Sequence, residues 1–97
     1  MVNIIQKSNQ WQVAGPVLMD NADEALNQSI VLSMNDQLEI DFSGVTDVDT
    51  AALSLIMEWQ RRALATKCTI TFSNLPANLN SLAELYGVTS FISVTKS

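Results

Sequence analysis

The sequence predicts a single α/β domain, residues 1–97, built from a mixed β-sheet of four to five strands with packed helices. The length of 97 residues is close to that of one compact domain, and two domains would each be too short to bury a core. Hydrophobic residues make up 47% of the chain and charged residues only 15%, which excludes a disordered protein. Apolar residues alternate with polar ones in some segments and recur every three or four residues in others, so both strands and helices are expected.

The first third of the chain is expected to form a hairpin followed by a helix. Gly15 and Pro16 come after the second β-prone run and are expected to end that strand. Asp20 or Asn21 is positioned to cap the helix, because a side-chain oxygen there can accept hydrogen bonds from free backbone N–H groups. The expected bounds are 2–6 and 11–14 for the strands, 7–10 for the turn between them, and about residue 33 for the end of the helix.

The rest of the chain is expected to alternate between strands and helices. A loop at 43–46 precedes the long helix, and Pro76 opens the last helix, which Gly87 ends. A strand–helix–strand crossover makes its two strands parallel, so the sheet is mixed and the order is β-β-α-β-α-β-α plus a tail. The expected bounds are 38–42 and 69–73 for the strands, 51–65 for the long helix, and 88–94 for a short β or extended tail.

Side-chain patterns predict which faces are buried. Ile70 and Phe72 alternate with hydroxyl residues, so one face of the sheet is expected to be less buried than in a doubly wound fold. The last helix is expected to bury one face at Leu79, Leu82, Ala83 and Tyr86. One face of the sheet is therefore expected to be more polar than the other.

Charge and composition exclude several classes of function. Ten acidic residues against five basic ones give a net charge of −5, which argues against binding to nucleic acid or to anionic lipid. No apolar run reaches the length of a membrane helix and the N-terminus does not resemble a secretory signal. We therefore expect a cytoplasmic protein with no direct membrane insertion.

No segment predicts a catalytic, metal or cofactor site. Histidine is absent, which removes the commonest general base and metal ligand. Asp41, Asp47 and Asp49 lack the spacing of a calcium loop, and Asp49 is explained as the N-cap of the long helix. Cys68, the only cysteine, excludes an internal disulfide and is expected to be a small core residue. We expect a protein without enzymatic activity, metal or cofactor.

The long helix is apolar over about half of its circumference, which is more than a surface helix needs. The stripe expected to face the core contains Leu53, Ile56, Met57, Gln60 and Leu64. An adjoining stripe contains Ala52, Leu55, Trp59 and Ala63. Leu55 and Trp59 are either covered by another part of the domain, such as the third helix, or form an exposed ridge that binds a partner. Glu58 and Arg62 lie beside this ridge.

Residues 38–53, LEIDFSGVTDVDTAAL, resemble the signature of STAS domains, the family of sulfate transporters and anti-sigma factor antagonists. That signature has an apolar strand ending in Asp-Leu/Phe, a short loop, and Val-Asp-Ser-Ser/Thr-Gly-Leu at a helix start. The expected order of elements also matches the STAS fold over nearly the whole chain. Three further segments are most similar to the MlaB-like branch, small cytoplasmic subunits of a bacterial phospholipid-transporting ABC complex. They are DTAA at 49–52, WQVAGPVL at 11–18 and LAELYGV at 82–88.

The resemblance implies a docking function. MlaB-like subunits bind the ATPase subunit of an ABC transporter, so the implied partner-binding residues are Asp49, Thr50 and Ala51. The helix wheel adds Leu55, Glu58, Trp59 and Arg62 to this set. The implied location is the cytoplasmic side of the inner membrane, reached through the partner, in a system that maintains outer-membrane lipid asymmetry.

Two departures from the family signature bear on the function. A partner kinase phosphorylates the second hydroxyl residue of the motif in anti-sigma factor antagonists, but that position here is Ala51, which has no oxygen. Thr50 keeps the first hydroxyl and is the possible phosphorylation site, while Ala52 replaces the motif glycine. The alternatives are therefore an antagonist that binds an anti-sigma factor kinase, and a small nucleotide- or lipid-binding module. Ala51 favours the transporter subunit over the antagonist.

Overall fold

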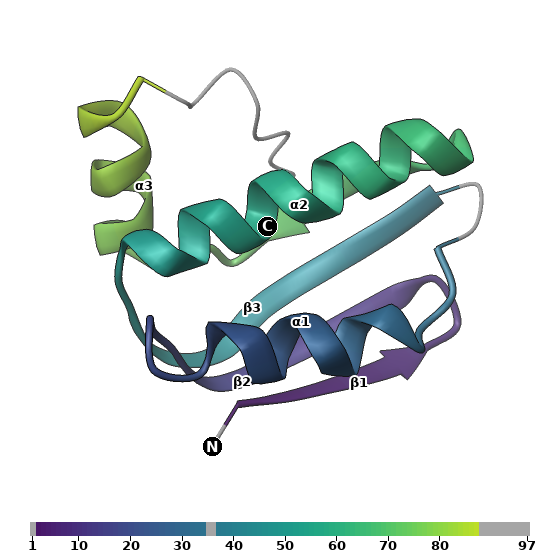
Figure 1. Ribbon diagram of the computed structural model, residues 1–97, viewed down its shortest axis with the longest axis horizontal. Coiled ribbons are helices and arrows are strands. Elements are labelled where there is room, and N and C mark those ends of the chain that lie inside the picture. Colours follow the sequence, from purple (N-terminus) through teal and green to yellow (C-terminus); the bar gives the residue numbers. More distant parts are fainter. Residues whose placement is uncertain (1, 35–36, 88–97) are drawn as a thin grey trace.

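The computed structural model describes residues 2–34 and 37–87, which form an α/β domain with the predicted order of elements (Figure 1). The strands are β1 (Asn3–Lys7), β2 (Gln10–Val17), β3 (Gln37–Val48) and β4 (Thr69–Ser73). The helices are α1 (Ala22–Ile30), α2 (Thr50–Thr66) and α3 (Ala77–Leu85). The tail predicted at 88–94 lies outside the described residues, so the fifth strand stays a prediction.

The described strands form one mixed sheet in the order β1-β2-β3-β4. β1 and β2 form the predicted antiparallel hairpin, and β3 is parallel to both β2 and β4. Both crossovers step across the sheet in the same direction, and such connections are almost always right-handed. α1 and α2 therefore lie side by side on one face of the sheet, and α3 packs beside the N-terminal half of α2 (Figure 1).

The core lies mainly between the sheet and the helices α1 and α2 (Figure 1). Strand register pairs Trp11 with Ile40 and Ile40 with Phe72, so their buried side chains point to the same face. Phe42 makes edge contacts with Phe72 and Trp59, which adds to the stabilisation from buried area. The opposite face of the sheet carries mainly polar residues, as predicted: Asn3, Lys7, Gln10, Gln12, Glu39, Asp41, Thr69, Thr71 and Ser73.

β2 and β3 are both longer than the sequence predicts. β2 continues through Gly15 and Pro16, and β3 continues through the predicted loop at 43–46. Two register shifts between these strands and a positive φ of 86° at Gly15 accommodate the proline without ending the pairing. A side chain at Gly44 would begin only 3.0 Å from the Cβ of Ala14, so the glycine allows close pairing rather than a turn.

Two helix ends also differ from the prediction. α1 ends at Ile30 rather than near Ser33, and the carbonyl groups of Leu32 and Ser33 beyond it accept hydrogen bonds from Arg62 and Trp11. Tyr86 was expected in the core but is 58% exposed, since α3 ends at Leu85 and the chain turns at Gly87 with a φ of 68°. Leu79 and Ala83 are buried as predicted.

Candidate partner-docking site

Leu55 and Trp59 are buried, with exposed fractions of 3% and 1%, so the prediction of an exposed ridge is wrong for both. The indole Nε1 of Trp59 donates a hydrogen bond of 2.9 Å to the Ser29 hydroxyl of α1. Its ring makes an edge contact with Trp11, with 5.6 Å between ring centroids. α1 and the sheet cover this stripe of α2, whereas the sequence suggested the third helix. Met57 and Leu64, predicted to be core, are 42% and 80% exposed.

Arg62 stabilises the C-terminal end of α1. Its guanidinium donates to the backbone carbonyl groups of Ser29, at 2.7 Å, and of Leu32. It also lies 5.7 Å from the ring centroid of Trp11. Carbonyl groups at a helix C-terminus lack partners within the helix and attract cations, so these contacts explain the residue structurally. The guanidinium is engaged within the monomer, and a role of Arg62 in partner binding stays a prediction.

Asp49 joins the start of α2 to the segment that precedes α1. One carboxylate oxygen accepts a hydrogen bond of 2.8 Å from the backbone N–H of Ala51, which confirms the predicted N-cap. The other oxygen accepts one of 3.0 Å from the backbone N–H of Met19. The carboxylate therefore holds the backbone of Met19, whose side chain is exposed, near the first turn of α2.

A hollow of about 290 Å³ lies between the N-terminal halves of α1 and α2, and we call it the α1–α2 hollow. Thr50, Ala51 and Glu58 of the predicted site line it, together with buried Leu55. Sequence reasoning missed its remaining lining residues, which are Met19, Ala22, Asp23, Leu26 and Ser54. Helix spacing could have indicated Ser54, one turn after Thr50, but only the packing of α1 against α2 brings Asp23 and Leu26 to the same site.

Thr50 lies where several surface depressions meet. It lines the α1–α2 hollow, a depression shared with Met57 and Tyr86, and another shared with Leu85. Its side chain is half-buried and makes no hydrogen bond within residues 2–34 and 37–87. The hydroxyl is therefore available to a partner, and Ala51 beside it offers only a methyl group.

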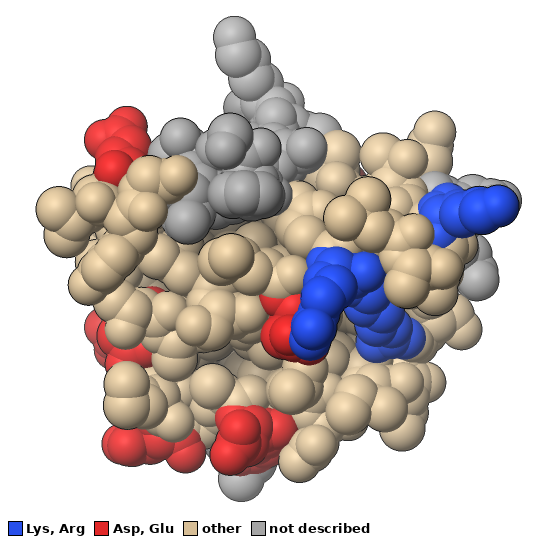
Figure 2. All heavy atoms as spheres, turned by 45° about the horizontal axis from the view of Figure 1, so that its top comes forward, with Lys and Arg blue, Asp and Glu red and all other residues tan. Residues whose placement is uncertain are grey.

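Glu58 forms an exposed ion pair with Arg61. The hydrogen bond from Arg61 and its positive charge hold the pKa of Glu58 below its usual value. Three of the four basic residues in the described ranges, Arg61, Arg62 and Lys67, lie in the C-terminal half of α2 or directly after it, and the fourth is Lys7 of β1. Figure 2 shows that basic and acidic groups are separated on one face, with basic atoms gathered on the right and most acidic groups at the left and bottom.

Asp41 lies away from this site, on the face of the sheet opposite α1 and α2. Burial acts to raise its pKa, but hydrogen bonds from Asn74 and from the backbone and hydroxyl of Ser43 outweigh it, so the pKa lies below its usual value. Within the described ranges, no three acidic or cysteine side chains gather closely enough to hold a metal ion. Cys68 is buried, as predicted for a core residue.

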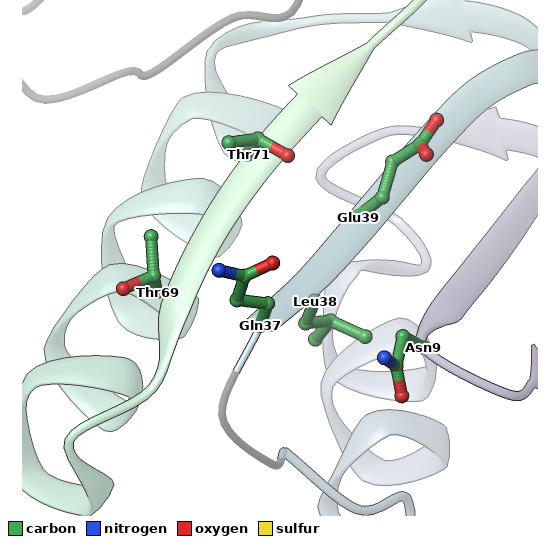
Figure 3. A pocket seen from close by; sticks show the side chains of 6 residues that line it. All are labelled: Asn9, Gln37, Leu38, Glu39, Thr69 and Thr71. Carbon is green, nitrogen blue, oxygen red and sulfur yellow. The ribbon is translucent and has the colours of Figure 1, made fainter.

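A second, polar hollow lies at the other end of the parallel strands (Figure 3). It is lined by Asn9, Gln37, Leu38, Glu39, Thr69 and Thr71. The Glu39 carboxylate accepts hydrogen bonds of 2.6 Å from Ser73 and 3.4 Å from Gln10. Ligand sites of α/β sheets usually lie at the carboxyl ends of the strands, and this hollow lies at the amino ends of β3 and β4. We therefore place the candidate site at the start of α2.

The structure also bears on membrane insertion. Across residues 2–34 and 37–87, the helices are too short or too polar to cross a bilayer.

Comparisons with known proteins agree with this fold and indicate a family. A family model described as "Mlab, STAS domain" matches residues 7–94. A search of curated proteins finds no match. The unphosphorylated anti-sigma factor antagonist SpoIIAA has a similar structure, with a TM-score of 0.70 and 9% identity over 100% of this chain and 89% of that chain.

Two further solved structures share the fold at low identity. Moorella thermoacetica RsbS S58E has a TM-score of 0.63 and 15% identity, covering 99% of this chain and 86% of that one. The murine anion transporter Slc26a9 has a TM-score of 0.72 and 17% identity, covering 96% of this chain and 17% of the transporter. At such identities the likeness supports the fold alone.

Proposed function

The chain belongs to the STAS domain family, and we propose that it is a non-enzymatic subunit that docks on the ATPase of a phospholipid-transporting ABC complex. The observation that carries this proposal is the surface at the start of α2. The Thr50 hydroxyl has no hydrogen-bond partner in the described part of the chain, and the α1–α2 hollow opens beside it. Asp49 links the start of α2 to the segment before α1 through its two backbone hydrogen bonds. A preorganised surface of this kind is suited to protein binding.

The family match and one substitution favour a transporter subunit over a phosphorylation switch. The description of the matching family model names Mlab, and the sequence resembles MlaB-like subunits at both ends of the domain. Ala51 occupies the position that resembles the phosphorylated residue of anti-sigma factor antagonists, and a methyl group cannot accept phosphate. A docking subunit needs no such chemistry.

The proposed location follows from the proposed partner. The domain would lie on the cytoplasmic side of the inner membrane, held there by the ATPase rather than by its own lipid contacts. Its net charge of −5 would disfavour direct adsorption to anionic lipid. The complex as a whole would maintain the lipid asymmetry of the outer membrane.

The Thr50→Glu variant tests the docking site. A carboxylate at this half-buried position suits the positive end of the α2 dipole, so the domain should stay folded. The longer glutamate side chain would project into the hollow beside Thr50 and obstruct the contact with the partner, so the affinity for the purified ATPase subunit should fall about tenfold or more. Titration calorimetry measures the affinity, and thermal unfolding reports on the fold.

Thr69→Glu is the matched control, because Thr69 is exposed at the start of β4 and lines the polar hollow instead. Its affinity should remain within twofold of the parent protein. Equal affinities for the two variants would contradict the docking site. No binding to the ATPase, together with binding to an anti-sigma factor kinase that phosphorylates Thr50, would support the antagonist instead.

A further inference from the structure

The α1–α2 hollow combines an apolar floor with an acidic rim. Ala22 and Leu26 of α1 and Ala51 of α2 provide aliphatic surface. Asp23 and Glu58 bring a carboxylate from each helix to the same hollow. This combination matches a long aliphatic side chain that ends in a positive charge, because its stem gains from apolar contact while its head needs an anion.

The two carboxylates differ in what they already bind. Glu58 is paired with Arg61 of its own helix. Asp23 lies in the first turn of α1, is exposed, and has no hydrogen-bond or ion-pair partner among residues 2–34 and 37–87. An incoming cation would therefore meet Asp23 without first displacing a protein group.

The charge around the hollow strengthens this preference. The acidic residues in the segments that lead into α1 and α2, or in their first turns, are Asp20, Asp23, Glu24, Asp47 and Asp49. The basic residues of α2 lie toward its other end, as Figure 2 shows for one face. A partner surface that is basic opposite the hollow is attracted there and repelled at the far end of α2, which fixes its orientation.

We propose that the α1–α2 hollow receives an arginine or lysine side chain of the ATPase subunit, with its charged head at Asp23 and its aliphatic stem against Leu26 and Ala51. This inference rests on the proposed function and adds the chemistry of the partner's contact. An arginine would suit the site especially well, because its weakly hydrated guanidinium loses less on leaving water than an ammonium does.

The Asp23→Asn variant tests the charge contact, with Glu84→Gln as its control. Glu84 is an exposed carboxylate on α3 that does not line the hollow, so both variants remove one negative charge. Asp23→Asn should weaken binding to the purified ATPase subunit about tenfold in low salt, and Glu84→Gln less than twofold. The difference should shrink in 0.5 M salt (about 4 Å of screening length), since salt screens the contact.

The Ala22→Met variant tests the hollow without changing charge. Ala22 is half-buried at the start of α1, so a longer side chain there fills the hollow while the helix remains intact. The affinity should fall about tenfold with little change in melting temperature. Binding of Ala22→Met and Asp23→Asn with the parent's affinity would overturn the inference.

The outcomes separate this inference from the proposed function. If the parent protein does not bind the ATPase subunit, the proposed function fails and the inference fails with it. If the parent binds and Thr50→Glu abolishes binding, while Asp23→Asn behaves like Glu84→Gln, only the inference is overturned.

Discussion

The inner side of α2, which faces α1 and the sheet, and its outer side carry similar apolar side chains, but only those on the inner side are buried. On the inner side, Leu55 and Trp59 pack against α1 and the sheet. On the outer side, Leu64 is 80% exposed and Met57 is 42% exposed. Residue type does not distinguish these sides. Hydrophobicity alone therefore does not show which apolar stripe of α2 is buried. The packing of α2 against α1 and the sheet decides it.

The largest expected effect is at Trp59, at the centre of the inner side. Trp59→Ala should lower the free energy of unfolding by about 3–5 kcal/mol, because it leaves a large cavity and removes the donor to Ser29. Urea denaturation measures this loss. Trp59→Phe keeps most of the apolar volume and should cost less than Trp59→Ala. A small loss for Trp59→Ala would mean that the indole is not part of the core.

A matched pair of leucines gives the sharpest form of the comparison. Leu55→Ala should cost about 2–5 kcal/mol, since it removes buried atoms from the core. Leu64→Ala should change the free energy of unfolding by less than about 0.5 kcal/mol, because the side chain is largely in water and alanine favours helix. Chemical denaturation of both variants under the same conditions checks the prediction. Equal losses at the two positions would remove the distinction between the sides.

Two neighbouring arginines allow the same comparison for charge. Arg62→Gln should cost about 1–3 kcal/mol, because the backbone carbonyl groups of Ser29 and Leu32 lose their charged donor. Arg61→Gln removes only an exposed ion pair with Glu58 and should cost clearly less than Arg62→Gln. Thermal unfolding of the two variants gives the difference. A larger effect at Arg61 would contradict the assignment of Arg62 to the inner side.

A smaller loss than at Trp59 or Leu55 is expected at Asp49, the N-cap of α2. Asp49→Ala should lower the free energy of unfolding by about 1–2 kcal/mol, through loss of the α2 cap and of the bond to Met19. Asp47→Ala is the control, since Asp47 is exposed and does not cap the helix. Denaturation curves should separate the two variants. Equal stability would show that the cap contributes little.

Local sequence signals predicted those features that depend on residues close together in the chain. The alternation in 69–73 matches β4, and Asp49 caps α2 as its position before the helix predicted. The strand–helix–strand order was enough to predict parallel pairing of β3 with β4. By contrast, Gly15, Pro16 and Gly44 were interpreted as breaks in strands. These residues instead lie within β2 and β3, and Gly44 allows the two strands to pair closely. This pairing joins segments far apart in the sequence, so no local pattern predicts it.

The candidate site divides in the same way. Thr50, Ala51 and Glu58 were identified from the family signature and the helix wheel, and they line the α1–α2 hollow. Leu55 lines its buried floor, whereas Trp59 and Arg62 belong to the contact between α2 and α1. Asp23 and Leu26 line the hollow only because α1 packs against α2, which the sequence did not predict.

The sequence by itself determined the order of elements, the start of α2 and the chemistry available there, because periodicity and capping act over a few residues. Only the tertiary structure decided which stripe of α2 is buried. Both crossovers pass over the same face of the sheet, so α1 lies beside α2 and covers Leu55 and Trp59. That placement depends on contacts between residues about 30 positions apart, such as Ser29 with Trp59, which a pattern within one helix cannot encode.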